Sequence, residues 1–326
     1  MSRSEFAESF RNFLKRYDCF VLSGHVRPDG DSVGACAALC FYLEELGKKA
    51  YVYADGDIAR YTRLLPEFPV LGEEEAASIS GFAFIMLDVA EPPRTGRAEG
   101  FLMRAKASLC VDHHVSGREY TDFFYCEPEC SSVSEVLYGL FMEMGAEISG
   151  PMAKALFLGS AFDTGGFRHS GTTAATYRMA AELVERGADA TSTLNGLFHS
   201  KSFSAQRGLS LAIRKAKLYE DGILMCCLTM GDVYQVQSQM AELDAVAGEL
   251  NEIEEALVVC VLREMNDGTI RVNMRSKDKV DVARVAACFG GGGHVRAAGC
   301  TVADPMLLVK ENLLAAIRRQ LAEQEA

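Results

Sequence analysis

Short apolar runs alternate with longer mixed stretches over the first part of the chain. The apolar runs predict β-strands at residues 20–23, 50–54, 82–87 and 107–111. The stretch 32–46 has the length and apolar spacing of a helix, and Gly47 marks its end. Short apolar strands that alternate with helices indicate a parallel sheet with helices on both faces.

Further helices are indicated by amphipathic spacing and by residues typical of helix ends. They are predicted at 1–15, 133–144, 151–162 and 172–186, and 72–80 is a loop or short helix. Pro151 suits a first helical position, and Gly145 and Gly187 suit positions just past a helix end. The α-helical block therefore follows the predicted strands.

The pattern becomes more polar and then restarts. Residues 189–217 read as helical but polar, and we expect the connection between two domains there. Beyond it, strands are predicted at 223–229, 257–263, 269–275 and 300–302, and helices at 233–255, 281–289 and 305–323. A chain of 326 residues can bury two cores. We expect an α/β domain at 1–188, a helical linker at 189–218 and a smaller α/β domain at 219–326.

Composition places the chain among ordinary globular proteins, with 49% hydrophobic and 24% charged residues. No apolar run approaches the roughly 20 residues that a membrane span needs. The first residues read as an amphipathic helix and not as the apolar core of a signal peptide. The 11 cysteines are scattered and odd in number, which favours buried free thiols in a reducing compartment. We therefore expect a cytoplasmic protein without a membrane partner.

The formal net charge of −12 restricts the class of partner. An extended groove for long DNA or RNA needs many phosphate contacts from Lys and Arg, so long nucleic acids are disfavoured. A compact anionic substrate is not disfavoured, because bound metal would reverse the local charge.

The first candidate ligands lie on the turn between strand 20–23 and helix 32–46. His25, Asp29 and Asp31 are spaced H-x3-D-x-D, with Gly30 between the two aspartates. Imidazole and carboxylate at the carboxyl edge of a parallel sheet can hold a divalent metal. The alternative is a simple turn in which Asp31 caps the following helix.

Further candidates follow three apolar segments. Asp88 ends strand 82–87, where a carboxylate costs solvation energy unless it is paired or bound to metal. Adjacent residues His113 and His114 follow Asp112 at the next strand end and should point in opposite directions, so one can bind metal and the other face substrate. Asp163 follows the apolar helix 151–162. A cap or turn role is the alternative for Asp88 and Asp163.

The second domain contains the run 290–293 of four glycines, followed by His294. The run fits neither a Walker P-loop nor G-x-G-x-x-G, but glycines allow close backbone approach and N–H groups that meet an anion. A mobile linker is the alternative. Residues 271–296 contain six basic and two acidic side chains, which favours an anion site.

In order and spacing, these motifs resemble the four motifs of the DHH phosphoesterases. The segment 290–294 resembles the motif of the DHH-associated domain, and the resemblance covers nearly the whole chain. The two-domain length is similar to that of the bacterial nano-RNase and 3′-phosphoadenosine-5′-phosphate (pAp) phosphatase branch, relatives of the RecJ exonuclease. The resemblance implies an active site in the cleft between the two domains.

The resemblance also implies roles for particular residues. One divalent ion would be held by His25, Asp29 and Asp88, and a second by Asp31, Asp88, His113 and Asp163. His114 would contact a phosphate oxygen or the leaving group, and Asp112 would orient a histidine, so Asp88, His114 and Asp112 are the expected catalytic residues. Substrate would be bound by His114, Arg275, Ser276, Gly292, Gly293 and His294. Manganese is the expected metal, with magnesium as the alternative. From the family motif we expect a larger residue at the position of Gly166. This departure affects the expected shape of the substrate edge of the site.

The expected function is therefore two-metal hydrolysis of short RNA oligonucleotides, such as the dinucleotide pApA, and of pAp. Cyclic di-AMP hydrolysis, inorganic pyrophosphate hydrolysis and nucleotide sensing without catalysis are the alternatives. The expected partners are short oligoribonucleotides and nucleotides, with no long duplex, and a homodimer is left open.

Overall fold

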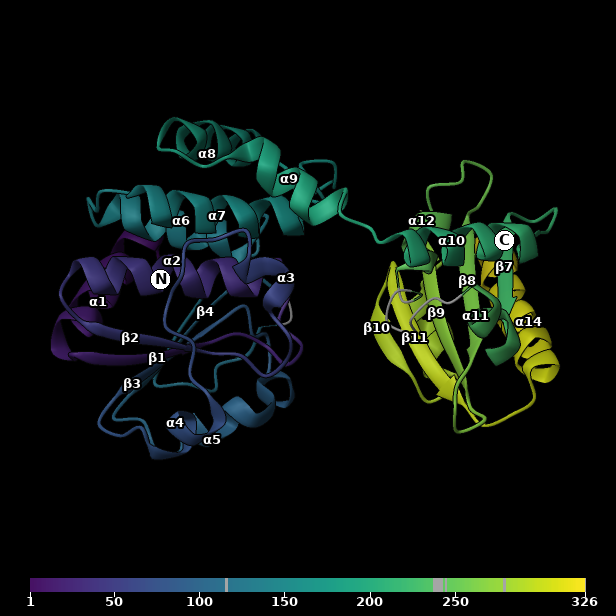
Figure 1. Cartoon of the computed structure of the whole chain (residues 1–326), viewed down its shortest axis with the longest axis horizontal. Coiled ribbons are helices and arrows are strands. Elements are labelled where there is room, and N and C mark those ends of the chain that lie inside the picture. The colour runs from purple at the N-terminus through teal and green to yellow at the C-terminus, as the bar shows by residue number, and fades with distance from the viewer. Residues whose placement is uncertain (115–116, 237–242, 244, 278–279, 326) are drawn as a thin grey trace. The chain divides into compact units, whose positions relative to one another are not determined.

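The computed structural model describes residues 1–326 except 115–116, 237–242, 244, 278–279 and 326. The chain divides into two compact units, Met1–Ser200 and Lys201–Ala326, which Figure 1 shows. The segment expected as a linker is shared between them. Helix α9 (Ala190–Phe198) belongs to the first unit, and α10 (Phe203–Lys215) belongs to the second.

The first unit contains a five-stranded parallel sheet in the order β2-β1-β3-β4-β5. Its strands are β1 (Cys19–Ser23), β2 (Lys49–Tyr53), β3 (Ala83–Leu87), β4 (Ser108–Asp112) and β5 (Phe123–Cys126). The first four lie where the apolar runs predict them. The sequence analysis missed β5, a half-exposed edge strand whose apolar run, Phe123–Cys126, is only four residues long.

Helices cover both faces of this sheet, as the pattern predicts (Figure 1). Side chains alternate along β1, so that Phe20 and Leu22 join one core and Val21 joins the other. The larger core includes α1 (Arg3–Arg16), α2 (Gly30–Glu45), α6 (Val133–Glu143), α7 (Gly150–Asp163) and α8 (Ala174–Glu185). The opposite core includes α4 (Glu73–Ser78), the 3-10 helix η1 (Pro92–Ala98) and α5 (Glu99–Leu102), and the short α3 (Ala59–Thr62) packs against α2.

Strand β1 lies between β2 and β3, so the chain turns to opposite sides of β1 in its two crossovers. Such a point leaves a crevice at the carboxyl edge of an open parallel sheet, where ligands bind in folds of this kind. The loops that follow β1, β3 and β4 all begin at this edge.

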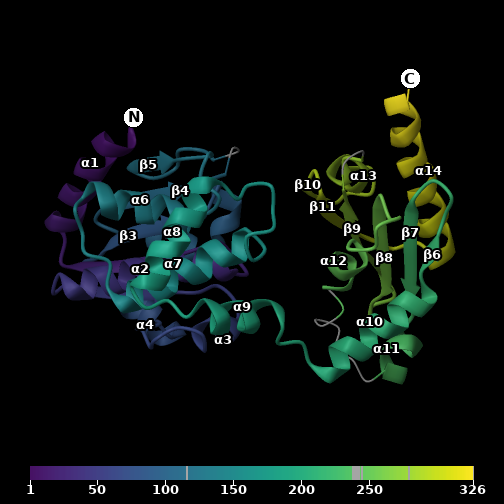
Figure 2. The same cartoon turned by 90° about the horizontal axis from the view of Figure 1, so that it is seen from above.

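The second unit has a six-stranded sheet in the order β10-β11-β9-β8-β7-β6 (Figure 2). Only β7 and β8 pair in parallel. Its strands are β6 (Lys217–Leu218), β7 (Ile223–Leu228), β8 (Val258–Glu264), β9 (Ile270–Ser276), β10 (Gly292–His294) and β11 (Ala297–Val302). Helices α13 (Val282–Ala287) and α14 (Met306–Glu325) pack on one face, and α10, α11 (Met230–Val236) and α12 (Val246–Leu250) pack on the other. The predicted helix 233–255 corresponds to α11 and α12, and 237–242 and 244 lie outside the described residues.

The glycine run forms a helix end and a strand, so the expectation of N–H groups available to an anion is wrong for its first half. Gly290, at φ +70°, donates its N–H to the Ala287 carbonyl, and Gly291 donates its N–H to the Ala286 carbonyl. These two hydrogen bonds form a Schellman motif at the end of α13. Gly292 and Gly293 lie in β10 and pair with Gly299 and Ala298. The local backbone is therefore ordered by pairing with β11.

All 11 cysteines are free thiols. Across the described ranges, no helix combines the length and the apolarity that crossing a bilayer requires.

Candidate metal and phosphate site

Four segments bring the predicted ligands of the first unit together. His25 lies two residues after β1, Asp88 directly follows β3, His113 and His114 follow β4, and Asp163 ends α7. Their ligand atoms form three groups in which all atoms lie within 4.8 Å of one another. The groups are His25 with Asp29 and Asp88, Asp31 with His113 and Asp163, and Asp88 with His113 and His114.

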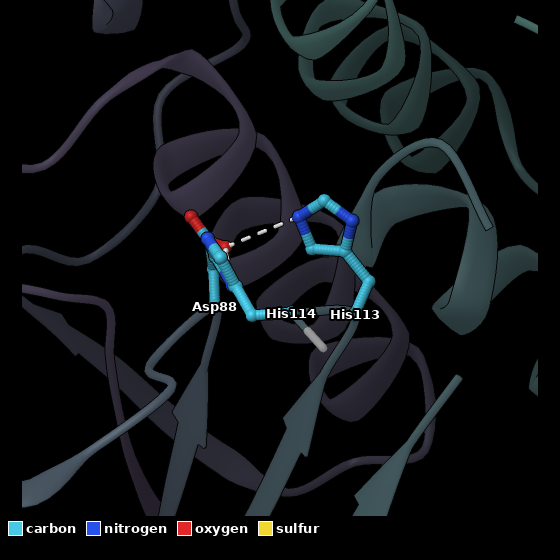
Figure 3. Close-up of side chains that lie close together, drawn as sticks. All are labelled: Asp88, His113 and His114. Carbon is cyan, nitrogen blue, oxygen red and sulfur yellow. Dashed lines mark ion pairs between the residues drawn. The ribbon is translucent and has the colours of Figure 1, made fainter. Parts of the chain in front are cut away.

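Asp88 belongs to two of these groups, and Figure 3 shows the one that it forms with His113 and His114. Its Oδ2 is 3.4 Å from His25 Nε2, and its Oδ1 is 3.6 Å from His113 Nε2 and 3.5 Å from His114 Nδ1. The side chain is only 3% exposed, and the backbone has φ +65°, which is uncommon for a residue other than glycine. Strained backbone of this kind is concentrated at functional sites. Asp88 thus faces the ligand candidates of both neighbouring strands.

Two imidazoles are fixed by backbone carbonyls. His25 Nδ1 lies 2.9 Å from the Val26 carbonyl, and His113 Nδ1 lies 3.3 Å from the Cys130 carbonyl. A carbonyl only accepts, so Nδ1 carries the hydrogen in each ring. In the neutral form, Nε2 then presents its lone pair to the carboxylates, as a metal-binding histidine does.

Asp29 serves two purposes. Its Oδ1 accepts hydrogen bonds from the N–H groups of Asp31 and Ser32 and so caps α2. Its Oδ2 lies 3.3 Å from His25 Nε2. The alternative that Asp31 caps this helix is therefore wrong, because Asp29 is the cap.

Asp31 binds the N-terminus of a different helix. Its carboxylate accepts from Val133 N–H at 2.6 Å, from Ser134 N–H at 3.0 Å and from the Ser134 hydroxyl at 2.5 Å. The first turn of α6 favours a negative charge. Burial nevertheless raises the pKa of Asp31, and the charges of Asp163 and Asp88 add to this effect.

Close packing of α2 on α7 brings Asp31 near Asp163. A Cβ at Gly34 of α2 would lie 2.6 Å from the Ala155 carbonyl of α7, and one at Gly159 of α7 would lie 2.6 Å from Asp31 Oδ1 of α2. The helices can approach this closely only because these positions lack side chains. Asp163 Oδ2 consequently reaches 3.1 Å from His113 Nε2.

Asp112 holds the two residues that follow it. Its Oδ1 accepts from the His113 N–H at 2.8 Å and from His114 Nδ1 at 2.8 Å. The carboxylate therefore fixes the orientation of the His114 ring and leaves its Nε2 for another group.

The carboxylates favour protonated imidazoles. Burial opposes charge on His25, but Asp29 and Asp88 outweigh it and raise its pKa to about 10. Burial likewise opposes charge on His113, yet Asp163 and Asp88 raise its pKa to about 12. Burial also opposes charge on Asp88, but the two imidazoles lower its pKa. The same field that favours protons favours metal cations.

The donors fit a divalent metal. In the described part of the chain, the buried atoms Asp88 Oδ1, Asp112 Oδ2 and His113 Nε2 have no hydrogen-bond partner. Buried polar atoms without partners are rare and expensive, and a cation would satisfy those that face the cluster. Imidazole and carboxylate without thiolate suit manganese or magnesium better than softer metals.

The predicted substrate-binding residues of the second unit lie on β9 and β10. Arg275, half-buried on β9, donates from Nη1 to the Met274 carbonyl, and burial lowers its pKa. Ser276 is buried, and its hydroxyl donates to the Val280 carbonyl at 2.6 Å. Arg275 pairs in register with Ala297, as His294 does. The side chain of His294 lies outside the described part of the structure.

Two family models match the chain. "DHH family, N-terminal domain" matches residues 19–160, and "DHHA1 domain" matches residues 229–323. The chain therefore contains a DHH-family N-terminal domain and a DHHA1 domain. This confirms the resemblance inferred from the motifs and the α/β fold that it implies.

Relatives match over nearly the whole chain. The Thermus thermophilus protein named "Bifunctional oligoribonuclease and PAP phosphatase NrnA" is 29% identical over 304 residues, which are 92% of this chain and 89% of the relative. The Bacillus subtilis protein of the same name is 27% identical over 292 residues, 89% of this chain and 91% of the relative. The crystal structure of an exopolyphosphatase-related protein from Bacteroides fragilis has a TM-score of 0.91 at 23% identity, covering 98% of this chain and 97% of that one, which shows the shared fold.

Sequence reasoning missed the groups that hold the ligands. Ser134 and the Cys130 carbonyl contact Asp31 and His113, and His169 Nδ1 lies 2.9 Å from the Asp163 carbonyl. The polar cluster at 130–135 before a helix was a usable signal. A backbone carbonyl that orients an imidazole leaves no mark in the sequence.

Proposed function

We propose that this chain is a divalent-metal-dependent phosphoesterase that hydrolyses short RNA oligonucleotides and removes a phosphate from pAp. The observation that carries the proposal is the convergence of imidazoles and carboxylates on the buried, strained Asp88. The names of the Thermus thermophilus and Bacillus subtilis relatives support this choice of substrate.

In this proposal two ions share Asp88. His25, Asp29 and Asp88 would hold one, and Asp31, Asp88, His113 and Asp163 would hold the second. The donor atoms of Asp31, His113 and Asp163 lie within 4.8 Å of one another, and Asp88 Oδ1 lies 3.6 Å from His113 Nε2. A divalent ion bound there polarises a phosphate oxygen and lowers the pKa of a water. We propose manganese in preference to magnesium because the donor set mixes imidazole with carboxylate.

His114 and Asp112 have the geometry of a proton donor and its support. Asp112 accepts the Nδ1 proton of His114, so Nε2 is the ring atom available to a substrate oxygen. We propose that His114 stabilises the leaving oxygen and that Asp112 acts by holding the imidazole. In the second unit, Arg275, Ser276, Gly292, Gly293 and His294 remain the proposed contacts for a terminal phosphate or nucleotide.

The test is a product time course on labelled short oligoribonucleotides, pApA, pAp, cyclic di-AMP and pyrophosphate. Each substrate is incubated with manganese, with magnesium and with a chelator. We expect release of mononucleotides from the short RNAs and of phosphate from pAp, only with metal. Cyclic di-AMP as the preferred substrate would replace the proposed activity with cyclic dinucleotide hydrolysis. Pyrophosphate hydrolysis alone, or nucleotide binding without turnover, would contradict it.

We also place this activity in the cytoplasm, since 11 free thiols suit a reducing compartment. The homodimer that the sequence leaves open can be tested by sedimentation analysis.

A further inference from the structure

The loops that carry the ligand candidates also carry arginines. Arg27 lies between His25 and Asp29 in the loop after β1. Arg94 lies in the segment after β3, and Arg118 lies in the loop after β4. We call these three residues the arginine rim.

Backbone hydrogen bonds hold these loops together. Val26 donates its N–H to the Arg94 carbonyl at 2.8 Å, so the Arg27 and Arg94 loops are in contact. The Arg118 N–H donates to the Ala90 carbonyl at 2.9 Å, and Ala90 stands two residues after Asp88. All three rim positions therefore belong to one edge of the sheet, around the metal-ligand candidates.

The rim guanidinium groups have no hydrogen bond, ion pair or ring contact with any residue that the structure describes. Two other arginines of this unit are paired, Arg3 with Glu127 and Arg97 with Asp55. Three such guanidinium groups on neighbouring loops of one sheet edge are unexpected in a chain with 45 acidic and 33 basic residues. Asp55, whose carbonyl accepts the Arg27 N–H, already binds the Arg97 N–H and Nε.

Arg27 also has a strained backbone, with φ +56°. The left-handed region costs roughly 1–2 kcal/mol for a residue with a Cβ, and asparagine or glycine tolerates it better. Arg27 is exposed, so core packing does not explain the choice of arginine. An exposed, strained and unpaired arginine beside a reaction site is explained by contact with a ligand.

We propose that the arginine rim binds the phosphate group that is not cleaved, in nucleotides that carry two or more phosphates. The proposal rests on the proposed phosphoesterase function and adds the substrate class, because the rim favours pAp and phosphorylated dinucleotides over ligands with one phosphate. Guanidinium groups bind phosphate oxygens in pairs and keep their charge at every working pH.

The test uses the full chain with manganese and the variants Arg27→Asn, Arg94→Gln, Arg118→Gln and their triple combination. Arg178→Gln is the matched control, because Arg178 is exposed on α8 and likewise has no contact with a described residue. We expect each single change to raise KM for pAp about tenfold, as loss of a charged hydrogen bond implies, with kcat within about twofold. KM for the unphosphorylated dinucleotide ApA should change little. Arg27→Asn should not lower the melting temperature, because asparagine accepts this backbone.

An unchanged KM for pAp in the triple variant would contradict the proposed role of the arginine rim. An equal rise in the KM for ApA, or an equal rise in the KM for pAp in the control Arg178→Gln, would also contradict it. Metal titration of each variant should give the wild-type Kd, which shows that the ligand cluster is intact. If wild-type protein turns over no substrate, the proposed function fails separately. The rim is then judged by equilibrium binding of pAp, where equal Kd values for wild type and triple variant contradict it.

Discussion

The Asp31 carboxylate and Ser134 are 103 positions apart in the sequence and share two hydrogen bonds, from the serine N–H at 3.0 Å and from its hydroxyl at 2.5 Å. The hydroxyl orients a carboxylate that also lies within reach of His113 and Asp163. In the proposed metal site, a carboxylate held by such a neighbour would need no reorientation to bind a cation.

Replacing Ser134 by alanine should therefore weaken metal binding. We expect the Kd for manganese to rise about tenfold. The protein should keep its fold, and KM should change less than the affinity for metal. Calorimetric titration of metal-free protein measures the change. Ser9→Ala is the control, since Ser9 is half-buried on α1 and its hydroxyl donates to the Glu5 carbonyl of the same helix. Equal metal affinity in Ser134→Ala and Ser9→Ala would show that the hydroxyl does not position Asp31.

Replacing Asp88 by asparagine should abolish turnover while preserving the fold. Asparagine tolerates φ +65°, so the backbone is not a cause of any loss. We expect kcat to fall at least about a thousandfold, because a metal site supplies several kcal/mol of transition-state stabilisation. Asp18→Asn, at a side chain that is 99% exposed, is the control. A variant at position 88 with wild-type rates would remove the metal-dependent account.

Metal affinity should increase with pH. The pKa of His25 is raised to about 10 and that of His113 to about 12, so both rings are protonated at pH 7 in the metal-free protein. Metal must displace these protons, and affinity should rise up to about tenfold per pH unit for each proton released. Titrations at pH 6.5, 7.5 and 8.5 in buffers of different ionisation enthalpy count the protons. Binding that is independent of pH and releases no protons would exclude the two imidazoles as ligands.

Substitution of Gly166 should destabilise the fold because of the backbone conformation at this position, and not through an effect on metal binding. It has φ +71°, and an added Cβ would lie 3.3 Å from the Phe198 ring. We expect Gly166→Ala to lower the free energy of unfolding by about 1–2 kcal/mol. Gly171→Ala is the control, because an added Cβ there meets open space. Calorimetric melting compares the two, and equal melting temperatures would contradict the prediction.

Much of the fold and of the ligand set could be inferred from local patterns. Buried parallel strands need continuous apolar runs, so β1 to β4 were visible, and polar residues directly after such runs must lie at the carboxyl edge of the sheet. His25, Asp88 and His113 were found in this way. Their order and spacing also carried the resemblance to the DHH family, which the family models confirm.

The remaining features depend on contacts between distant segments, which no local pattern encodes. Strand β5 is short and half-exposed, and its pairing with the edge of β4 defines it as a strand. Asp31 and Asp29 are chemically alike in the sequence, and only the packing of α6 decides that Asp29 caps α2 while Asp31 binds Ser134. The strained backbone of Asp88 and Arg27 is likewise imposed by the surrounding loops. The sequence therefore supplies the imidazole and carboxylate side chains, and the tertiary structure decides which of their oxygens and nitrogens face one another.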